Sequence, residues 1–96
     1  MTLPLGDVLG SLDGFDPQST IYAPPNRPLS PDSPAYITVE GSPVPAGLSY
    51  LLEVVVAVDV IETWSRWRSG RIPTEQDLVA AVVWYADRDA YLPADE

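Results

Sequence analysis

The sequence contains no cysteine, no histidine and no lysine, and its only basic side chains are five arginines. Without cysteine the chain can form no disulfide, no thiolate nucleophile and no cysteine-ligated zinc site. Without histidine it has no imidazole base and no histidine-bound metal, and without lysine it has no Schiff base and no P-loop lysine. The side chains left for catalysis are carboxylates, hydroxyls, tyrosine and arginine.

These absences exclude most common enzyme mechanisms. The sequence also lacks a Gly-rich phosphate loop, an internal repeat and a cluster of metal ligands at a recognised spacing. We therefore predict no catalytic residue, no metal site and no cofactor. The alternative class is a small enzyme that works through carboxylates, with or without Mg²⁺.

Acidic side chains outnumber basic ones by 14 to 5, which gives a net charge of −9. Binding to a phosphate backbone needs clustered bases, so we predict no nucleic acid partner. An anionic membrane surface is disfavoured for the same reason. A basic protein is the better electrostatic match, although the same charge also serves to keep a small protein in solution.

Neither a signal peptide nor a membrane span is visible in the sequence. Residues 1–10 hold no base ahead of an apolar core, and the apolar stretch 48–61 is short and interrupted by Glu53 and Asp59. We therefore predict a cytoplasmic protein. With 96 residues, 46% of them hydrophobic, we expect a single domain over residues 1–93 and a frayed acidic tail at 94–96.

The N-terminal part of the chain predicts a short helix and two strands. An apolar stripe at helical spacing runs through residues 3–15 and consists of Leu5, Val8, Leu9 and Leu12. Residues 19–23 and 35–40 favour extended backbone, so we expect them to form a small antiparallel ribbon. Prolines at 25, 28, 31 and 34 recur with the period of polyproline II. This ridge either docks into an aromatic groove of a partner or lies against aromatic residues of its own chain.

A long helix is predicted over residues 49–70, with Ser49 as its N-cap and Gly70 as its stop. The three valines at 54–56 favour a strand, but the length of the segment and its caps favour the helix. Glu53 would then lie in the first turn and reach solvent. Trp64 and Trp67 share the core-facing stripe of this helix, together with Ala57, Val60 and Ile61.

A second helix is predicted over residues 74–88. Thr74 is its N-cap, and Glu75 and Asp77 place carboxylates in its first turn. Because the connection to the preceding helix is short, we expect the two to form an antiparallel hairpin. The fold class is thus α+β: a helical hairpin and a short N-terminal helix packed with an antiparallel ribbon and Pro-rich loops.

The candidate partner-binding site lies at the end of the second helix. Trp84 falls off the apolar face of that helix, and tryptophan is enriched at the centres of interfaces. Arg88 follows one turn later and can stack on the indole ring. The candidate residues are Trp84, Asp87, Arg88, Asp89 and Tyr91. Trp84 is covered either by another layer of this chain, such as the proline segment, or by a partner or second copy.

The only basic cluster is formed by Arg66, Arg68 and Arg71. These residues are candidates for anion binding, of a phosphate or a carboxylate. The alternative is that they complement the C-terminal end of the long helix and pair with nearby acids such as Glu62.

The segments YLLEVVVA at 50–57 through Trp64, TIYA at 20–23 and SPA at 33–35 resemble small acidic bacterial proteins of a domain-of-unknown-function family. This resemblance covers most of the chain and implies no activity and no catalytic residues. Taken together, these features predict a non-enzymatic interaction module of the bacterial cytosol, such as an immunity protein, an antitoxin or a regulatory adaptor. Such a module would present an acidic, aromatic-bearing surface to a protein partner. A homo-oligomeric structural subunit is a further alternative.

Overall fold

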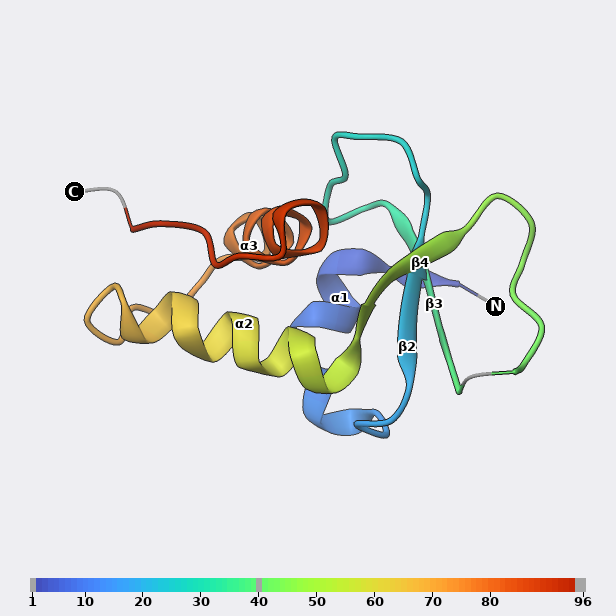
Figure 1. Ribbon diagram of the computed structural model, residues 1–96, viewed down its shortest axis with the longest axis horizontal. Helices are drawn as coiled ribbons and strands as arrows, with labels where there is room; N and C mark the ends of the chain where they lie inside the picture. The colour runs from blue at the N-terminus through green and yellow to red at the C-terminus, as the bar shows by residue number, and fades with distance from the viewer. Residues whose placement is uncertain (1, 40, 95–96) are drawn as a thin grey trace.

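The sheet of this protein has four antiparallel strands and is wider than the predicted ribbon. The computed structural model describes residues 2–39 and 41–94, and Figure 1 shows its helices gathered on one side of the sheet. The strands are β1 (Leu3–Pro4), β2 (Thr20–Ala23), β3 (Pro34–Thr38) and β4 (Ser49–Glu53), in the order β1-β3-β2-β4. The predicted pairing of β2 with β3 is confirmed.

The predicted helix over residues 49–70 is wrong in its first part. Residues 49–53 form β4, and the helix α2 (Val54–Arg66) begins directly after it. The reason is tertiary: the free edge of β2 pairs with β4, which places Ile21 opposite Leu52 and satisfies backbone groups that would otherwise lack partners. Ser49 is therefore the first residue of a strand and not an N-cap. The pairing includes an irregularity at Ile21 and Tyr22.

The other end of α2 is closer to the prediction. The helix ends at Arg66, and the chain turns through residues 67–70, where Gly70 adopts a φ of 80° and its N–H donates to the Ser65 carbonyl at 2.8 Å. A positive φ of this size favours glycine. Trp64 is buried as predicted, whereas Trp67 lies beyond the last helical residue and is 49% exposed. The prediction of a core position for Trp67 is therefore wrong.

The N-terminal helix is shorter than predicted. It divides into α1 (Leu5–Leu9) and the single 3₁₀ turn η1 (Leu12–Gly14). All four residues of the predicted apolar stripe are nevertheless buried: Leu5, Val8, Leu9 and Leu12. The apolar spacing thus identified the buried side chains correctly, although the helical conformation is interrupted between them.

Helix α3 (Glu75–Arg88) agrees with its prediction. Thr74 and Asp77 form a reciprocal capping box: the Asp77 N–H donates to the threonine hydroxyl at 3.1 Å, and the Thr74 N–H donates to the carboxylate at 3.0 Å. In Figure 1, α2 runs across the view and α3 is seen more nearly along its axis. The two helices pack on each other but cross, and the predicted antiparallel hairpin is not formed.

One core joins the sheet to all three helices. Its largest fully buried side chains come from every layer: Leu5, Val8, Ile21, Val54, Val60 and Val82. The mixed α+β fold class is thus confirmed. The acidic tail predicted at 94–96 falls mainly on Asp95 and Glu96, which lie outside the described residues. No helix in the described part of the chain combines the length and hydropathy needed to span a bilayer.

Candidate functional site

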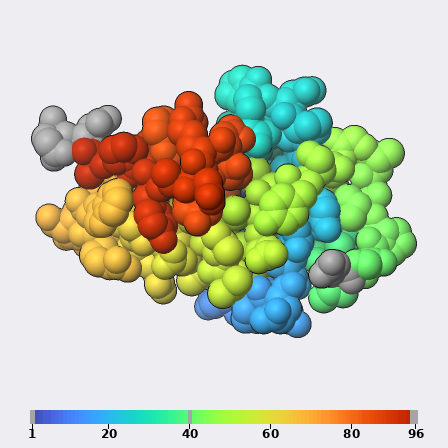
Figure 2. Space-filling model, in the orientation of Figure 1, coloured from blue at the N-terminus to red at the C-terminus, as the bar shows by residue number. Residues whose placement is uncertain are grey.

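A groove runs between the proline-rich segment and α3. We call it the Trp84 groove; its volume is about 360 Å³. The apolar part of its lining comes equally from the two segments: Pro28, Leu29, Pro31, Val79, Ala80 and Val83. Polar and aromatic residues complete it: Arg27, Ser30, Gln76, Trp84, Asp87 and Arg88. In Figure 2 the proline-rich segment (cyan) lies directly beside α3 (orange-red) at the surface.

The proline-rich segment is held in place by α1. The Leu5 N–H donates to the Ser33 carbonyl at 2.8 Å, and the Gly6 N–H donates to the Pro31 carbonyl at 2.9 Å. A Cβ atom on Gly6 would stand 2.9 Å from both Pro31 Cβ and the Glu75 Oε1 atom. Only glycine permits this approach without displacing a neighbour, so Gly6 sets the distance between α1 and the segment that forms one wall of the groove.

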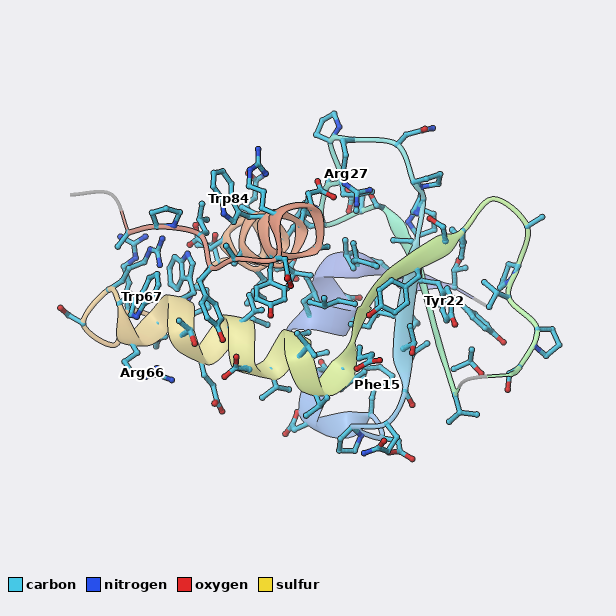
Figure 3. All side chains as sticks on the ribbon, viewed as in Figure 1. Phe15, Tyr22, Arg27, Arg66, Trp67 and Trp84 are labelled. Carbon is cyan, nitrogen blue, oxygen red and sulfur yellow. The ribbon has the colours of Figure 1, made fainter. Side chains whose placement is uncertain are left out.

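A second attachment joins the proline-rich segment to α3. The Arg27 guanidinium donates to both carboxylate oxygens of Asp87, at 3.2 and 3.1 Å, and also to the carbonyls of Pro24 and Pro25 at 3.2 Å each. The fork geometry of arginine permits this two-point contact with a carboxylate. Figure 3 shows Arg27 reaching from the segment toward α3. The two residues are separated by 60 positions in the sequence, so no local pattern predicts their pairing.

Trp84 lies half-buried on the side of α3 away from α2 (Figure 3). The Arg88 guanidinium stands over the indole ring, with its Cζ atom 3.8 Å from the ring centroid, so the predicted stacking is confirmed. The proline-rich segment lies along one side of the tryptophan without enclosing it. The structure thus places a layer of its own chain beside Trp84, with an open groove next to that layer. Cover of Trp84 by a partner or a second copy stays a prediction.

The remaining predicted partner residues do not all join this groove. Asp87 lines it, but Asp89 lies just past α3 in a left-handed conformation, with φ 55°, and is exposed. Tyr91 lies against α2 instead. Its hydroxyl donates to Asp59, and its ring makes an edge contact with Trp67 at a centroid distance of 5.7 Å. The hydrogen bond to Asp59 raises the pKa of Tyr91 above its ordinary value.

Two of the three arginines proposed for anion binding lie on the same tryptophan. Arg68 and Arg71 both stand over the Trp64 ring, at 4.4 and 5.0 Å from its centroid. Arg68 also donates to the carbonyls of Trp64, Leu92 and Pro93, which ties the C-terminal segment to the end of α2. Arg66 points away from Trp67 and the C-terminal segment (Figure 3). Anion binding by this cluster stays a prediction, and the observed role of Arg68 is structural.

A second pocket, of about 290 Å³, lies where the sheet meets the start of α2. We call it the Tyr50 pocket; its lining is Pro17, Gln18, Thr20, Tyr22, Tyr50, Glu53 and Val55. The strand register places Tyr22 opposite Tyr36 on one side and opposite Tyr50 on the other. Because side chains alternate along a strand, Tyr22 points to the face of β2 opposite the buried Ile21.

The Tyr50 pocket was not predicted from the sequence, because Tyr50 and Glu53 were expected to lie on a helix. The strand propensity noted in the sequence belongs to the valines at 54–56, which begin α2, so it gave no signal for the strand at 49–53. Tyr50 is 58% exposed, and the carboxylate of Glu53 makes no capping hydrogen bond at the start of α2. The partial burial of the Tyr50 phenol, together with the nearby Glu53 carboxylate and Tyr22, raises the pKa of Tyr50 above 10.0.

Within residues 2–39 and 41–94, no three side chains of the types that bind metals are grouped to hold an ion. The sequence matches no protein-family model, no curated protein and no solved structure. The resemblance to a domain-of-unknown-function family therefore stays a prediction, and a functional proposal has to be built on the two hollows themselves.

Proposed function

We propose that this protein is a non-catalytic binding module of the bacterial cytosol whose Trp84 groove receives an apolar side chain of a partner protein. The observation that carries the proposal is an open apolar groove edged by a tryptophan with an arginine stacked on it. Its volume, about 360 Å³, falls in the range of ordinary ligand sites. Tryptophan and arginine are also the residues most enriched at the energetic centres of protein interfaces.

The charges at the groove indicate what stands next to the apolar side chain of the partner. Arg27 is paired with Asp87, but Arg88 has no carboxylate partner among the described residues. A carboxylate on the partner, close to its apolar anchor, would pair with Arg88 while the guanidinium stays on the indole ring. The occupant we propose is therefore a segment with a large apolar residue followed or preceded by Asp or Glu.

The molecule as a whole is negatively charged, in contrast to the positive charge of Arg88 at the groove. The net charge of −9 favours encounter with a basic protein at long range, whereas the groove binds an apolar and acidic segment of that protein at short range. An immunity protein, an antitoxin or a regulatory adaptor would work in this way, by occupying a surface of its partner.

Peptide display tests this proposal with a defined probe. Random peptides are selected on the wild-type protein, and the affinities of the enriched peptides are then measured with Trp84→Ala and with Trp67→Ala. Trp67 is the matched control, because it is also a partly exposed tryptophan but does not line the groove. We expect the enriched peptides to combine an apolar residue with Asp or Glu. Trp84→Ala should weaken their binding about tenfold or more, and Trp67→Ala should leave it unchanged.

Two further measurements keep this test decisive. Trp84→Phe keeps an aromatic ring in the groove and replaces Trp84→Ala in the test if the alanine variant unfolds. Its affinity for the peptides should be lower than that of the wild type. Arg88→Ala should abolish the preference for peptides that contain Asp or Glu, whereas Arg66→Ala should retain that preference. Failure to enrich any peptide that depends on Trp84 would contradict the proposal. So would a wild-type dimer that dissociates on Trp84→Ala in sedimentation, because the occupant would then be a second copy of the chain.

A further inference from the structure

The Tyr50 pocket differs from the Trp84 groove in its chemistry. Two tyrosines and one carboxylate line it, and none of the five arginines does. Among the described residues, Glu53 forms no ion pair. A carboxylate beside aromatic rings, with no cation of its own chain to pair with, is the arrangement that recognises an external organic cation.

We propose that the Tyr50 pocket binds the guanidinium group of an arginine side chain from a basic protein segment. A planar guanidinium stacks on a phenol ring and at the same time donates two hydrogen bonds to a carboxylate, which a compact lysine ammonium does less well. The pocket offers both kinds of group from neighbouring elements: Tyr22 on β2, Tyr50 and Glu53 on β4.

The position of these groups supports a site that binds from solvent. Tyr50 and Glu53 are exposed, and Tyr22 is half-buried between them and the rest of the sheet. The volume of about 290 Å³ is close to the lower end of the range for ligand sites, about 300 Å³, which suits one long side chain rather than a large molecule. The net charge of −9 favours the approach of a basic segment to the molecule, and Glu53 is the charged group in the pocket.

This inference goes beyond the proposed function and does not depend on the Trp84 groove. It locates where basic residues of a partner would be held, whereas the groove holds an apolar and acidic segment. The two sites share no lining residue.

The probe is a blocked glycine–arginine–glycine peptide, titrated into the 96-residue protein and followed by amide chemical shifts in NMR spectra. A peptide in which citrulline replaces arginine has nearly the same shape but no charge and serves as the matched ligand control. We expect saturable shifts confined to residues around the pocket with the arginine peptide. Affinity should be about two- to fivefold lower for the citrulline peptide, and also for Glu53→Gln and Tyr50→Ala.

The matched protein control is Glu62→Gln, which removes an exposed carboxylate from α2 outside the pocket. It should leave the affinity almost unchanged, as should Trp84→Ala. Equal binding of the citrulline peptide, shifts spread over the whole surface, or an equal loss with Glu62→Gln would overturn the proposal. Any of these results would show that only the general negative field attracts the peptide. Because Tyr50 and Glu53 are exposed, both variants should fold, and thermal unfolding checks this.

Discussion

The Trp84 groove and the Tyr50 pocket are similar in size but are built in different ways. The groove brings together two segments far apart in the chain, the proline-rich segment and α3, which the Arg27–Asp87 pair joins. Two backbone hydrogen bonds from α1 also hold the proline-rich segment in place. The pocket arises from the pairing of two adjacent strands, β2 and β4, together with Pro17 and Gln18, which precede β2, and Val55 in the first turn of α2. One hollow depends on a loop that has to be held in place, and the other on strand register.

The two hollows also differ in the sign of their charge. Arg27, Asp87 and Arg88 line the groove, whereas Glu53 is the charged residue of the pocket. A net charge of −9 describes the average field around the molecule, but the placement of five arginines decides the field at each site. The difference shows that a partner of such a protein need not be basic at every contact.

Gly6→Val is expected to have the largest effect, because it should disrupt the Trp84 groove and leave the Tyr50 pocket intact. The new side chain would meet Pro31 and Glu75, so α1 and the proline-rich segment have to move apart. We expect a loss of about 1–3 kcal/mol in the free energy of unfolding, measured by urea denaturation. Binding of groove peptides should fall sharply, whereas the arginine peptide should still bind in the Tyr50 pocket.

The control for this change is Gly14→Ala in η1, where an added Cβ would meet no atom within 4 Å. The alanine should leave stability unchanged or raise it slightly, because it restricts the unfolded chain. If Gly6→Val and Gly14→Ala behave alike, the close approach of α1 does not hold the wall of the groove.

The features that could be predicted from the sequence are those with local causes. Helix α3 was predicted because its capping residues and its apolar face lie within one segment, and the stacking of Arg88 on Trp84 follows from their spacing of one turn. The pairing of β2 with β3 was predicted because each segment shows strand propensity by itself.

The features that could not be predicted depend on distant partners. Residues 49–53 become β4 because β2 offers them a free edge, and no property of the segment alone shows that edge. Three further features exist only in the folded chain, because they join residues distant in sequence. They are the Arg27–Asp87 pair, the close approach at Gly6 and the position of the proline ridge beside Trp84. The composition correctly indicated an acidic molecule, but it could not show that the Trp84 groove carries two arginines.

A smaller effect is expected from breaking the ion pair that closes the groove. The side chains of Arg27 and Asp87 are 32% and 39% exposed, so Asp87→Asn should lower stability by only about 0.2–1 kcal/mol. Arg27→Ala should cost more, because Arg27 also donates to the carbonyls of Pro24 and Pro25. Urea denaturation at low and high salt would measure both, and the loss with Asp87→Asn should shrink as salt rises. A larger loss with Asp87→Asn than with Arg27→Ala would refute the second role of Arg27.

The smallest expected effect is a change in the pKa of Tyr50, which tests whether the Glu53 carboxylate acts on the phenol in the Tyr50 pocket. Glu53→Gln removes one of the charges that raise the pKa of Tyr50, so that pKa should move down toward its ordinary value of 10.0 and stay above it, because partial burial of the phenol remains. NMR signals of the individual tyrosine rings would report this. Tyr91, whose pKa is raised mainly by its hydrogen bond to Asp59, is the internal control and should not change.

The same shift sets the direction of a pH effect on stability. The folded state holds the Tyr50 proton more tightly than the unfolded chain does. The contribution of Tyr50 to the free energy of unfolding is therefore fully present below pH 10.0 and is lost as the pH rises through the raised pKa of the folded state. In Glu53→Gln the loss should begin at the same pH and be smaller. If the Tyr50 pKa is identical in Glu53→Gln and in the wild type, the carboxylate does not act on the phenol. The pocket would then lack the pairing of charge and aromatic ring on which arginine binding depends.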